Sequence, residues 1–525
     1  MSPSLSQPII AAMLKVRQAF YAAIIRSLLR TKSVLQTILQ LWIAPSVIKE
    51  DVDDELHGRK SMYEEFLKGV EREFAESKEK ARLVKLSEGL RKQFGGSLQD
   101  STLNMLPSYN HQLPSGSECG TYLALDVGGS TFRIALIELL GRKSEGAQVE
   151  GSRILKKQAY KITSAVRQLK GVEFFDWMAQ RIGETLKDQD EGHDMSSDPL
   201  SMGMSWSFPI EQTSLRSGLL LGMGKGFLAA HGLLGKDLGD LIQDSCSRRG
   251  LNVQLNAIVN DSSATLLSKA YLDQTTRFAL ILGTGVNAAV HLPVHIFSPP
   301  KFGKRPETWH DAAKHVIVNT ELSMFGGGIL PYTKWDLQLR AAHTMPDFQP
   351  MEHFVSGGYL GEIVRLVLVD GILNAGLFGG VVPASLEGRY TLDTETVSDI
   401  ASDESPSLTA SRALFTSRHP SSTTPSLSDM RALRLIASHV TYRASGVAPP
   451  APTPSGPYAA LPRTSRLWSA SIRWWQNYPG FRESCQEQLD GLCVDSGGAK
   501  GVVELEFAEE SSLLGAAVAV ACLDG

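Results

Sequence analysis

Two similar apolar units organise the middle of the chain. In the first, the β-rich runs TYLALDV and TFRIALIEL are separated only by residues 128–130, which read GGS. In the second, FALILG and NAAVHL flank a short turn at residues 283–286, which reads GTGV. Each unit predicts a β-hairpin closed by a glycine turn. Because the same design occurs twice, the pattern also predicts an internal duplication.

A third pattern lies between the two hairpins. The segment NAIVNDSSATLLSKAYL passes from an apolar strand through Asn260 and Asp261 into a run with helical spacing. Asp261 is therefore expected at the carboxyl end of a strand, facing a cleft. Ligands of α/β sheets usually bind at such strand ends.

The first 49 residues differ from the rest in charge. They contain six basic residues and no acidic one: Lys15, Arg17, Arg26, Arg30, Lys32 and Lys49. One interpretation is an additional surface helix packed on the body through its leucines. The other is association with a membrane or with mitochondria, as basic amphipathic segments do. The pattern leaves both open.

Composition narrows the class of protein. A length of 525 residues predicts two to four domains. The net charge of -4 lacks the basic footprint of nucleic-acid binding, so no nucleic-acid partner is expected. The five cysteines are widely spaced and predict neither a disulfide framework nor a zinc site, which favours a reducing, cytoplasmic location.

The glycine turns point to phosphate chemistry. Backbone N–H groups of short glycine turns can approach phosphate oxygens because no Cβ stands in the way. Asp126 lies just before the first turn, separated from it by Val127, and is placed to hold a phosphate-bound Mg²⁺ through water, since magnesium keeps several waters and prefers oxygen ligands. A turn-stabilising aspartate is the alternative interpretation.

Six motifs, in order, resemble a known family. They run from residue 105 to 365 and read MLPSYNHQLPSGSECGTYLALDVGGSTFRIAL, SWSFPIEQTSLRSGLLLGMGKGF, VNDSSATLL, GTGVNAAV, NTELSMFGG and MEHFVSGGYLGEIVR. Together they are similar to the phosphate loops, sugar segment and catalytic segment of eukaryotic hexokinases and glucokinases. The resemblance implies an α/β chain with the duplicated actin-like ATPase (ribonuclease H-like) fold, in which two lobes flank a central cleft.

The resemblance also implies a reaction, ATP-dependent phosphorylation of a hexose with Mg²⁺, and a role for each matching residue. Asp261 is expected as general base and Lys225 as the cation near the transferring phosphoryl group. The implied hexose contacts are Ser207, Phe208, Asn260, Asn287, Glu321 and Glu352. The implied ATP contacts are Asp126, Gly128, Gly129, Ser130, Thr131, Arg133, Gly283, Thr284 and Gly285.

Three regions follow from these motifs. Residues 1–55 are the basic extension. Residues 56–267 form an N-terminal lobe with the first glycine turn, the sugar segment and Asp261. Residues 268–525 form a C-terminal lobe with the second turn and an altered adenosine region, in which 446–475 is proline-rich and expected to be disordered or aberrant.

The chain departs from the family pattern at the nucleotide end. The adenosine strand is expected to be missing, and the last motif reads SSLLGAA where the family has GSGKGAA. Gly224 stands where a threonine is usual. Two functions therefore remain open. One is a kinase that phosphorylates a hexose, glucose being expected, at its 6-hydroxyl for glycolysis. The alternative is a sugar-binding regulatory protein with impaired catalysis.

Overall fold

The computed structural model describes nine segments of the chain. These are residues 62–75, 80–142, 151–187, 198–224, 226–447, 466–470, 478–495, 497–508 and 510–523. The chain divides into two compact units, Met1–Phe66 and Leu67–Gly525, and the elements below belong to the second. The basic extension predicted at residues 1–55 lies outside the described residues.

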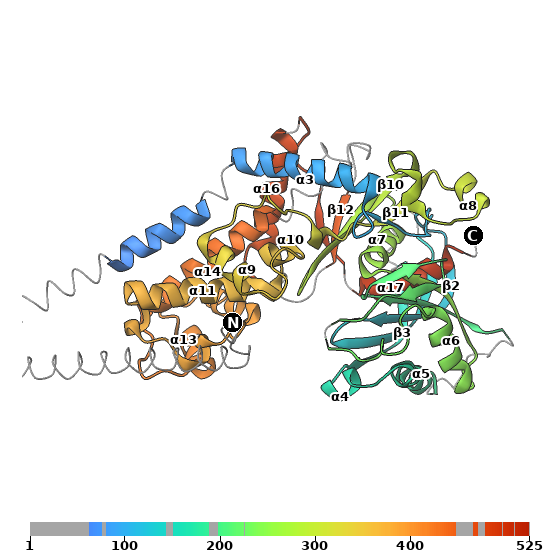
Figure 1. Cartoon of the computed structure of the whole chain (residues 1–525), viewed down its shortest axis with the longest axis horizontal. Helices are drawn as coiled ribbons and strands as arrows, with labels where there is room; N and C mark the ends of the chain where they lie inside the picture. Colours follow the sequence, from blue (N-terminus) through green and yellow to red (C-terminus); the bar gives the residue numbers. More distant parts are fainter. Residues whose placement is uncertain are drawn as a thin grey trace, which may run out of the picture. The chain divides into compact units, whose positions relative to one another are not determined.

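The first sheet forms between residues 119 and 259 (Figure 1). Its strand order is β4-β3-β2-β5-β8, in which β2–β3 and β3–β4 pair antiparallel while β2–β5 and β5–β8 pair parallel. The strands are β2 (Cys119–Val127), β3 (Thr131–Leu140), β4 (Ser152–Lys161), β5 (Leu200–Trp206) and β8 (Val253–Val259). β2 and β3 form the first predicted hairpin.

The second sheet repeats this plan. Its order is β1-β11-β10-β9-β12-β13, with β9–β10 and β10–β11 antiparallel and β12 parallel to both β9 and β13. Apart from the short edge strand β1, the order and the directions match those of the first sheet, which confirms the predicted duplication. The strands are β1 (Leu106–Pro107), β9 (Thr276–Leu282), β10 (Val286–Pro293), β11 (His315–Asn319), β12 (Arg466–Ala470) and β13 (Leu505–Phe507).

β12 corrects the expectation of a missing strand. Its backbone pairs with β9 over Arg466–Ala470 and with β13 over residues 467–469. In the duplicated plan, β12 takes the position that β5 holds in the first sheet. The proline-rich sequence before it gave no local strand signal, and the parallel pairing with β9 joins residues nearly 200 positions apart, which local patterns do not show. The remaining residues of 448–477 lie outside the described part.

Two helices pass between the sheets, and two more cover the outer face of the first sheet. α7 (Asp261–Leu272) and α17 (Ser511–Ala521) share one apolar cluster with residues of both sheets. α5 (Val172–Leu186) and α6 (Leu238–Arg248) pack with Phe132, Ile134 and Met204 in a second cluster. Helices thus cover both faces of the first sheet and the face of the second sheet that lies toward α7 and α17.

Glycine permits very close contact around α17. A Cβ on Gly515 would lie 1.8 Å from the backbone oxygen of Ala264 in α7. A Cβ on Gly203 in β5 would lie 2.0 Å from the backbone oxygen of Ala516. The GAA part of the last sequence motif therefore acts in packing, since it lets α17 lie directly against α7 and β5.

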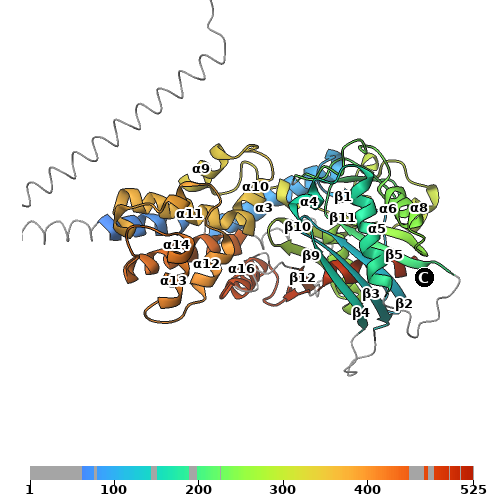
Figure 2. The same ribbon diagram turned by 90° about the horizontal axis from the view of Figure 1, so that it is seen from below.

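The second half of the chain adds a group of helices, which lie together in Figure 2. They are α9 (Lys334–Ala342), α10 (Pro350–Val355), α11 (Gly357–Ala375), α12 (Thr394–Ala401), α13 (Thr409–Arg418), α14 (Leu427–Val447) and α16 (Phe481–Asp495). Other elements are α3 (Lys80–Asp100), α4 (Ser164–Arg167), α8 (Glu307–Ala312), β6 (Ile210–Gln212) and β7 (Gly218–Leu220). Within the described segments, no helix is long and apolar enough to cross a membrane.

Candidate active site

Three parallel strands of the first sheet end at one edge and bring their following residues together. β2 leads into the first glycine turn, β5 into Ser207, and β8 into Asn260 and Asp261. Ser207 Oγ lies 3.3 Å from Asp261 Oδ2, and the backbone N–H of Ser262 donates to Asp261 Oδ1 at 2.8 Å. Asp261 is the first residue of α7, where the positive end of the helix dipole favours a carboxylate.

The first glycine turn is held from both sides. Gly128 donates its N–H to Thr131 O at 3.2 Å within the turn. Arg167, from the end of α4, donates through Nη2 to Gly129 O at 3.0 Å. Asp126 is buried and forms an ion pair of 2.9 Å with Arg133 Nη1 across the hairpin. The charge of Arg133 therefore offsets that of Asp126. The motif alone did not predict this ion pair.

The second glycine turn packs on two helices. Glu352 of α10 accepts from the backbone N–H of Val286 at 3.1 Å, and a Cβ on Gly285 would lie 2.5 Å from Glu352 Oε2. At the start of α11, Gly357 and Gly358 donate their N–H groups to Gly283 O and Thr284 O at 2.8 and 3.0 Å. Gly285 is thus required for the close approach of the Glu352 carboxylate.

Glu321 completes the polar group. It follows β11 with a left-handed backbone, φ 50°, a conformation that costs a residue with a side chain energy and often marks a functional position. Its Oε1 accepts from Asn319 Nδ2 at 2.8 Å, and Asn319 in turn accepts from Asn287 Nδ2 at 3.0 Å. Asn287 Nδ2 lies 3.4 Å from Asn260 Oδ1. The predicted residues Asn260, Asn287 and Glu321 therefore belong to one network.

Burial and like charge shift two carboxyl groups of this site. Burial raises the pKa of Asp126 to about 6; Asp261 adds to the shift, and Arg133 opposes it. Burial likewise raises the pKa of Glu321 to about 7, opposed by the Asn319 hydrogen bond and increased by the charges of Asp261 and Glu352. Several carboxylates thus converge, the arrangement expected where an enzyme tunes acid and base groups.

Two predicted site residues need separate comment. Phe208 lies in the core, with its ring centroid 5.2 Å from that of Trp206 and 5.1 Å from that of Phe227. In this position it anchors the loop that carries Ser207. Lys225, the predicted catalytic cation, lies outside the described residues, and its neighbour Gly224 has a left-handed φ of 56°.

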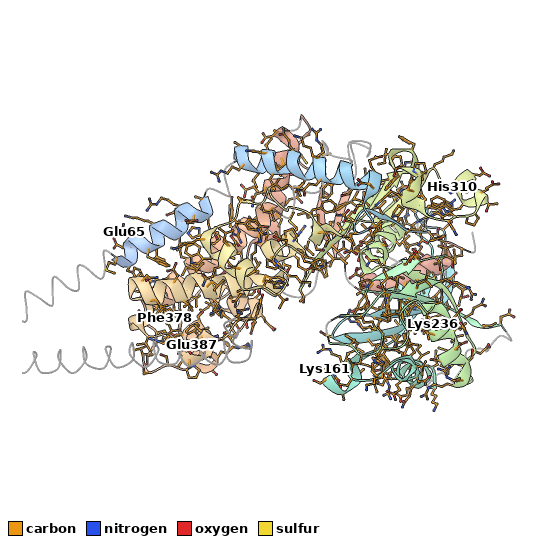
Figure 3. The ribbon with its side chains drawn as sticks, viewed as in Figure 1. Glu65, Lys161, Lys236, His310, Phe378 and Glu387 are labelled. Carbon is orange, nitrogen blue, oxygen red and sulfur yellow. The ribbon has the colours of Figure 1, made fainter. Side chains whose placement is uncertain are left out.

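At the nucleotide end, Leu513 and Leu514 stand where the family motif has glycine and lysine. Leu513 and Leu514 are helical residues of α17, and the left-handed position falls on Glu510, φ 45°, just before the helix. Glu510 pairs with Lys157 of β4 at 2.9 Å. On the same strand, Lys161 pairs in register with Thr131, the residue after the first glycine turn, and is labelled in Figure 3. This edge therefore carries positive charge next to the turn.

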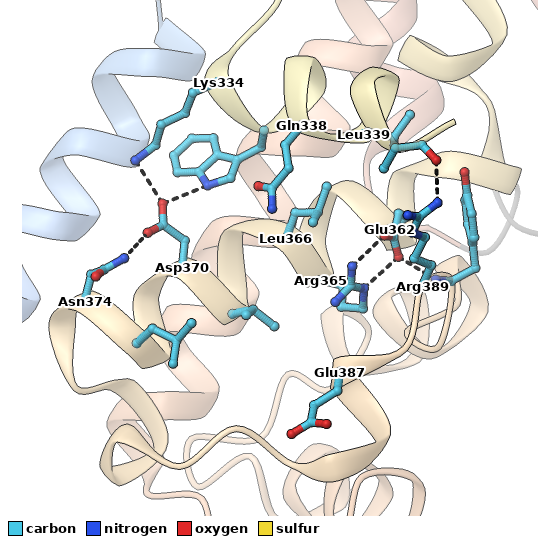
Figure 4. Close-up of a pocket in the computed structure, with 15 residues that line it drawn as sticks. Lys334, Gln338, Leu339, Glu362, Arg365, Leu366, Asp370, Asn374, Glu387 and Arg389 are labelled. Atoms are coloured by element: carbon cyan, nitrogen blue, oxygen red, sulfur yellow. Dashed lines mark hydrogen bonds and ion pairs between the residues drawn. The ribbon is translucent and has the colours of Figure 1, made fainter. Parts of the chain in front are cut away.

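A cavity of about 590 Å³ lies elsewhere, between α9, α11 and residues 384–390, and none of the predicted site residues lines it (Figure 4). Asp370 accepts from Lys334, Trp335 and Asn374, with Asn374 Nδ2 at 2.6 Å. Arg365 and Glu362 form a buried bidentate pair. Because these charges are already paired, the cavity does not compete with the strand-end site as the place of reaction.

The donors at the strand-end site fit ATP with magnesium. Magnesium bound to phosphate needs only one or two protein carboxylates, with water completing its ligands. Asp126 provides an oxygen donor beside the first glycine turn, and glycine turns of this kind let backbone N–H groups approach phosphate oxygens. Among the described residues, no group of three or more His, Cys, Asp or Glu side chains could hold a metal by itself. A magnesium ion here would therefore depend on the phosphates.

Family models agree with these features. Two models described as hexokinase match residues 67–271 and 277–453. Among curated proteins, Hexokinase-2 of Oryza sativa subsp. japonica is 33% identical over 62% of this chain and 63% of its own length. Hexokinase-2 of Candida albicans is 29% identical over 87% of this chain and 92% of its own length. The chain spans about three fifths of the plant relatives that it matches, for example 60% of the chloroplastic Hexokinase-2 of Nicotiana tabacum.

Solved structures extend the similarity to the fold. The hexokinase of Schistosoma mansoni complexed with glucose superposes with a TM-score of 0.71 and 27% identity, covering 88% of this chain and 99% of that one. A second hexokinase crystal structure gives a TM-score of 0.66 at 24% identity, over 89% of this chain and all of that one. These comparisons agree with the predicted actin-like, two-lobed α/β fold.

Proposed function

This chain belongs to the hexokinase family, and we propose on that basis that it catalyses ATP-dependent phosphorylation of a hexose at the 6-hydroxyl. The observation that carries the proposal is the position of Asp261. It begins α7 at a strand end, beside Ser207 and next to a network of three asparagines and Glu321. A base adjacent to several fixed polar groups suits a hydroxylated substrate.

The proposed chemistry is a direct transfer. The hexose 6-hydroxyl gives its proton to the Asp261 carboxylate while its oxygen bonds to the γ-phosphorus of ATP, and the bond to the bridging oxygen breaks to release ADP. Ser207 and the Ser262 N–H orient the two carboxylate oxygens for this step. Lys225 is proposed to stabilise the charge on the transferring group.

ATP and magnesium are proposed to bind through one carboxylate and the two glycine turns. ATP supplies the phosphoryl group, and magnesium neutralises its phosphates. Asp126 is proposed to hold the magnesium through water, and Gly128, Gly129, Gly283 and Gly285 to let backbone N–H groups approach the phosphates. Gly129 is positioned for this by Arg167.

We propose the hexose contacts from residues that the network already orders. Asn260, Asn287, Glu321 and Glu352 lie around Asp261 and are proposed to recognise the sugar hydroxyls. Glucose is the proposed substrate, since a structurally similar hexokinase is complexed with glucose, and the product would enter glycolysis. The proposed lobes remain 56–267 and 268–525, with a cleft that closes on the sugar.

Location is a separate proposal. We propose a cytoplasmic protein whose first 49 residues, rich in Lys and Arg and free of acidic residues, attach it to a membrane or to mitochondria. A fusion of the full chain to a fluorescent protein should then be membrane-bound, and deletion of residues 1–49 should release it. Diffuse fluorescence with and without this segment would contradict the attachment.

Hexose-dependent ADP formation tests the activity. The wild-type chain should form ADP with glucose, and Asp261→Asn should lose at least about a hundredfold in kcat, the usual contribution of a general base. Asp240→Asn is the matched control, because Asp240 also lies in the first turn of a helix, on α6. Glucose binding without ADP formation in the wild type would favour the regulatory hypothesis.

A further inference from the structure

Asn319 is the first residue of the motif NTELSMFGG, which assigned it no role of its own, and it lies at the centre of the polar network. It is the last residue of β11. Its Oδ1 accepts from Asn287 Nδ2 at 3.0 Å and from the backbone N–H of Glu321 at 3.2 Å, and its Nδ2 donates to Glu321 Oε1 at 2.8 Å. One side chain therefore contacts both the backbone and the carboxyl group of Glu321.

The direction of these bonds is determined by backbone groups. A backbone N–H can only donate, so the bond from Glu321 N identifies the oxygen of Asn319 and leaves its NH₂ for the carboxyl group. In the same way, Leu322 N donates to Asn287 Oδ1 at 3.3 Å, and Ser262 N donates to Asn260 Oδ1 at 2.9 Å. Each amide of the network thus has one orientation that satisfies its neighbours.

Asn319 also supports an unusual backbone conformation. The bond from Glu321 N to Asn319 Oδ1 closes a turn of the kind that asparagine side chains form two residues ahead. Within this turn Glu321 has φ 50°. A left-handed residue with a large side chain is strained by about 1 kcal/mol or more, so it persists only where its surroundings hold it.

The charges around Glu321 make this support necessary. Burial raises the pKa of Glu321, and two acidic groups face it, Asp261 from α7 and Glu352 from α10. The Asn319 N–H bond acts against these influences and favours the carboxylate. An ionised Glu321 accepts hydrogen bonds with both oxygens, whereas a protonated one loses part of this capacity.

We infer that Asn319 is a positioning residue of the hexose site, which holds the Glu321 carboxylate in one orientation and, through Asn287, aligns Asn260 beside Asp261. The inference rests on the proposed function, since it assigns these groups to hexose recognition. Asn319 is inferred to act through Glu321 and Asn287, without contacting the hexose itself.

Two substitutions test the role of each half of the amide. Asn319→Ala removes both the donor and the acceptor. Asn319→Asp retains an acceptor for Asn287 and for Glu321 N but replaces the donor to Glu321 by a second carboxyl group. Both should raise the pKa of Glu321, by about one unit for the alanine variant and by more for the aspartate variant.

The first readout needs no ligand. Infrared titration of the full chain should show a carboxyl band that disappears in Glu321→Gln and is thereby assigned to Glu321. Its midpoint should move upward in both Asn319 variants. Asn374→Ala is the matched control, because Asn374 also donates to a carboxylate, that of Asp370, outside the site (Figure 4). The control should leave the Glu321 midpoint unchanged.

The second readout is glucose affinity by calorimetry across pH. Near neutral pH, Asn319→Ala should bind glucose about tenfold to a hundredfold more weakly, as expected for a lost hydrogen bond to a charged group. Part of the affinity should return about one pH unit higher, where Glu321 ionises again. If Asn319→Ala weakened glucose binding only by destabilising the fold, without changing the ionisation of Glu321, the affinity would not recover at higher pH.

Three results would overturn the inference or its premise. An unchanged titration midpoint of Glu321 in a folded Asn319→Ala chain would contradict the claim that Asn319 stabilises the Glu321 carboxylate. A shifted midpoint with wild-type glucose affinity at every pH would overturn the role in hexose recognition. If the wild-type chain binds none of glucose, mannose and fructose, the proposed function is wrong. A shifted Glu321 midpoint in the Asn319 variants would in that case still support the stabilisation of the Glu321 carboxylate by Asn319.

Discussion

Replacing Glu321 by glutamine should stabilise the protein at neutral and alkaline pH. In the unfolded chain a glutamate has a pKa of 4.5, whereas burial raises that of Glu321 to about 7 in the folded chain. Between these values the folded chain binds the proton and the unfolded chain does not, so the free energy of unfolding falls as pH rises. At about 1.4 kcal/mol per unit, ionised Glu321 costs about 3 kcal/mol above pH 7.

Denaturant unfolding at several pH values measures this cost. Glu321→Gln should match the wild type below pH 4.5, where both states are protonated, and exceed it by about 3 kcal/mol above pH 7. Glu387→Gln is the control, because Glu387 is an exposed glutamate beside the cavity between α9 and α11, away from the strand-end site. Equal stability of Glu321→Gln and wild type across the whole range would refute the claim that the site stores an unfavourable buried charge.

Three further substitutions follow from individual contacts. Gly285→Ala should raise the KM for glucose by about tenfold in a steady-state assay, because the new Cβ would displace the Glu352 carboxylate; an unchanged KM would argue against Glu352 as a hexose contact. Asp336→Ala should lower the free energy of unfolding by about 3–5 kcal/mol, since it leaves the buried Arg443 guanidinium unpaired; a loss below about 1 kcal/mol would contradict this. Gly515→Ala should destabilise the chain by about 1–3 kcal/mol or prevent folding, because it pushes α17 off α7; a soluble variant with the wild-type melting temperature would contradict the close packing.

Local patterns predicted the elements of the fold that depend on neighbouring residues. Both glycine-turn hairpins are present, and Asp261 begins α7 with only Asn260 between it and the end of β8, as the change from β-rich to helical spacing indicated. The repeated design also predicted that the two sheets share one plan. These features were predictable because strand alternation, glycine turns and helix starts are read over a few residues.

Features that depend on distant contacts were not predictable in this way. β12 pairs on both sides, with β9 and with β13, although the sequence before it is rich in proline. The place of Phe208 in a motif predicted a hexose contact but did not show that its ring packs against Trp206 and Phe227. Asn319 begins the motif NTELSMFGG, but the motif gave it no role of its own, and that role emerges only from its bonds to Asn287 and Glu321.

The most direct test of the account follows the phosphoryl group itself. ATP labelled at the γ-phosphate is mixed with excess wild-type chain and glucose, and the products of a single turnover are separated. The label should appear in glucose 6-phosphate, and Asp261→Asn should bind glucose but transfer no label on the same time scale. Label that remains in ATP with the wild type, or transfer that is equally fast in Asp261→Asn, would contradict the assignment of this site as a hexose kinase with Asp261 as its base.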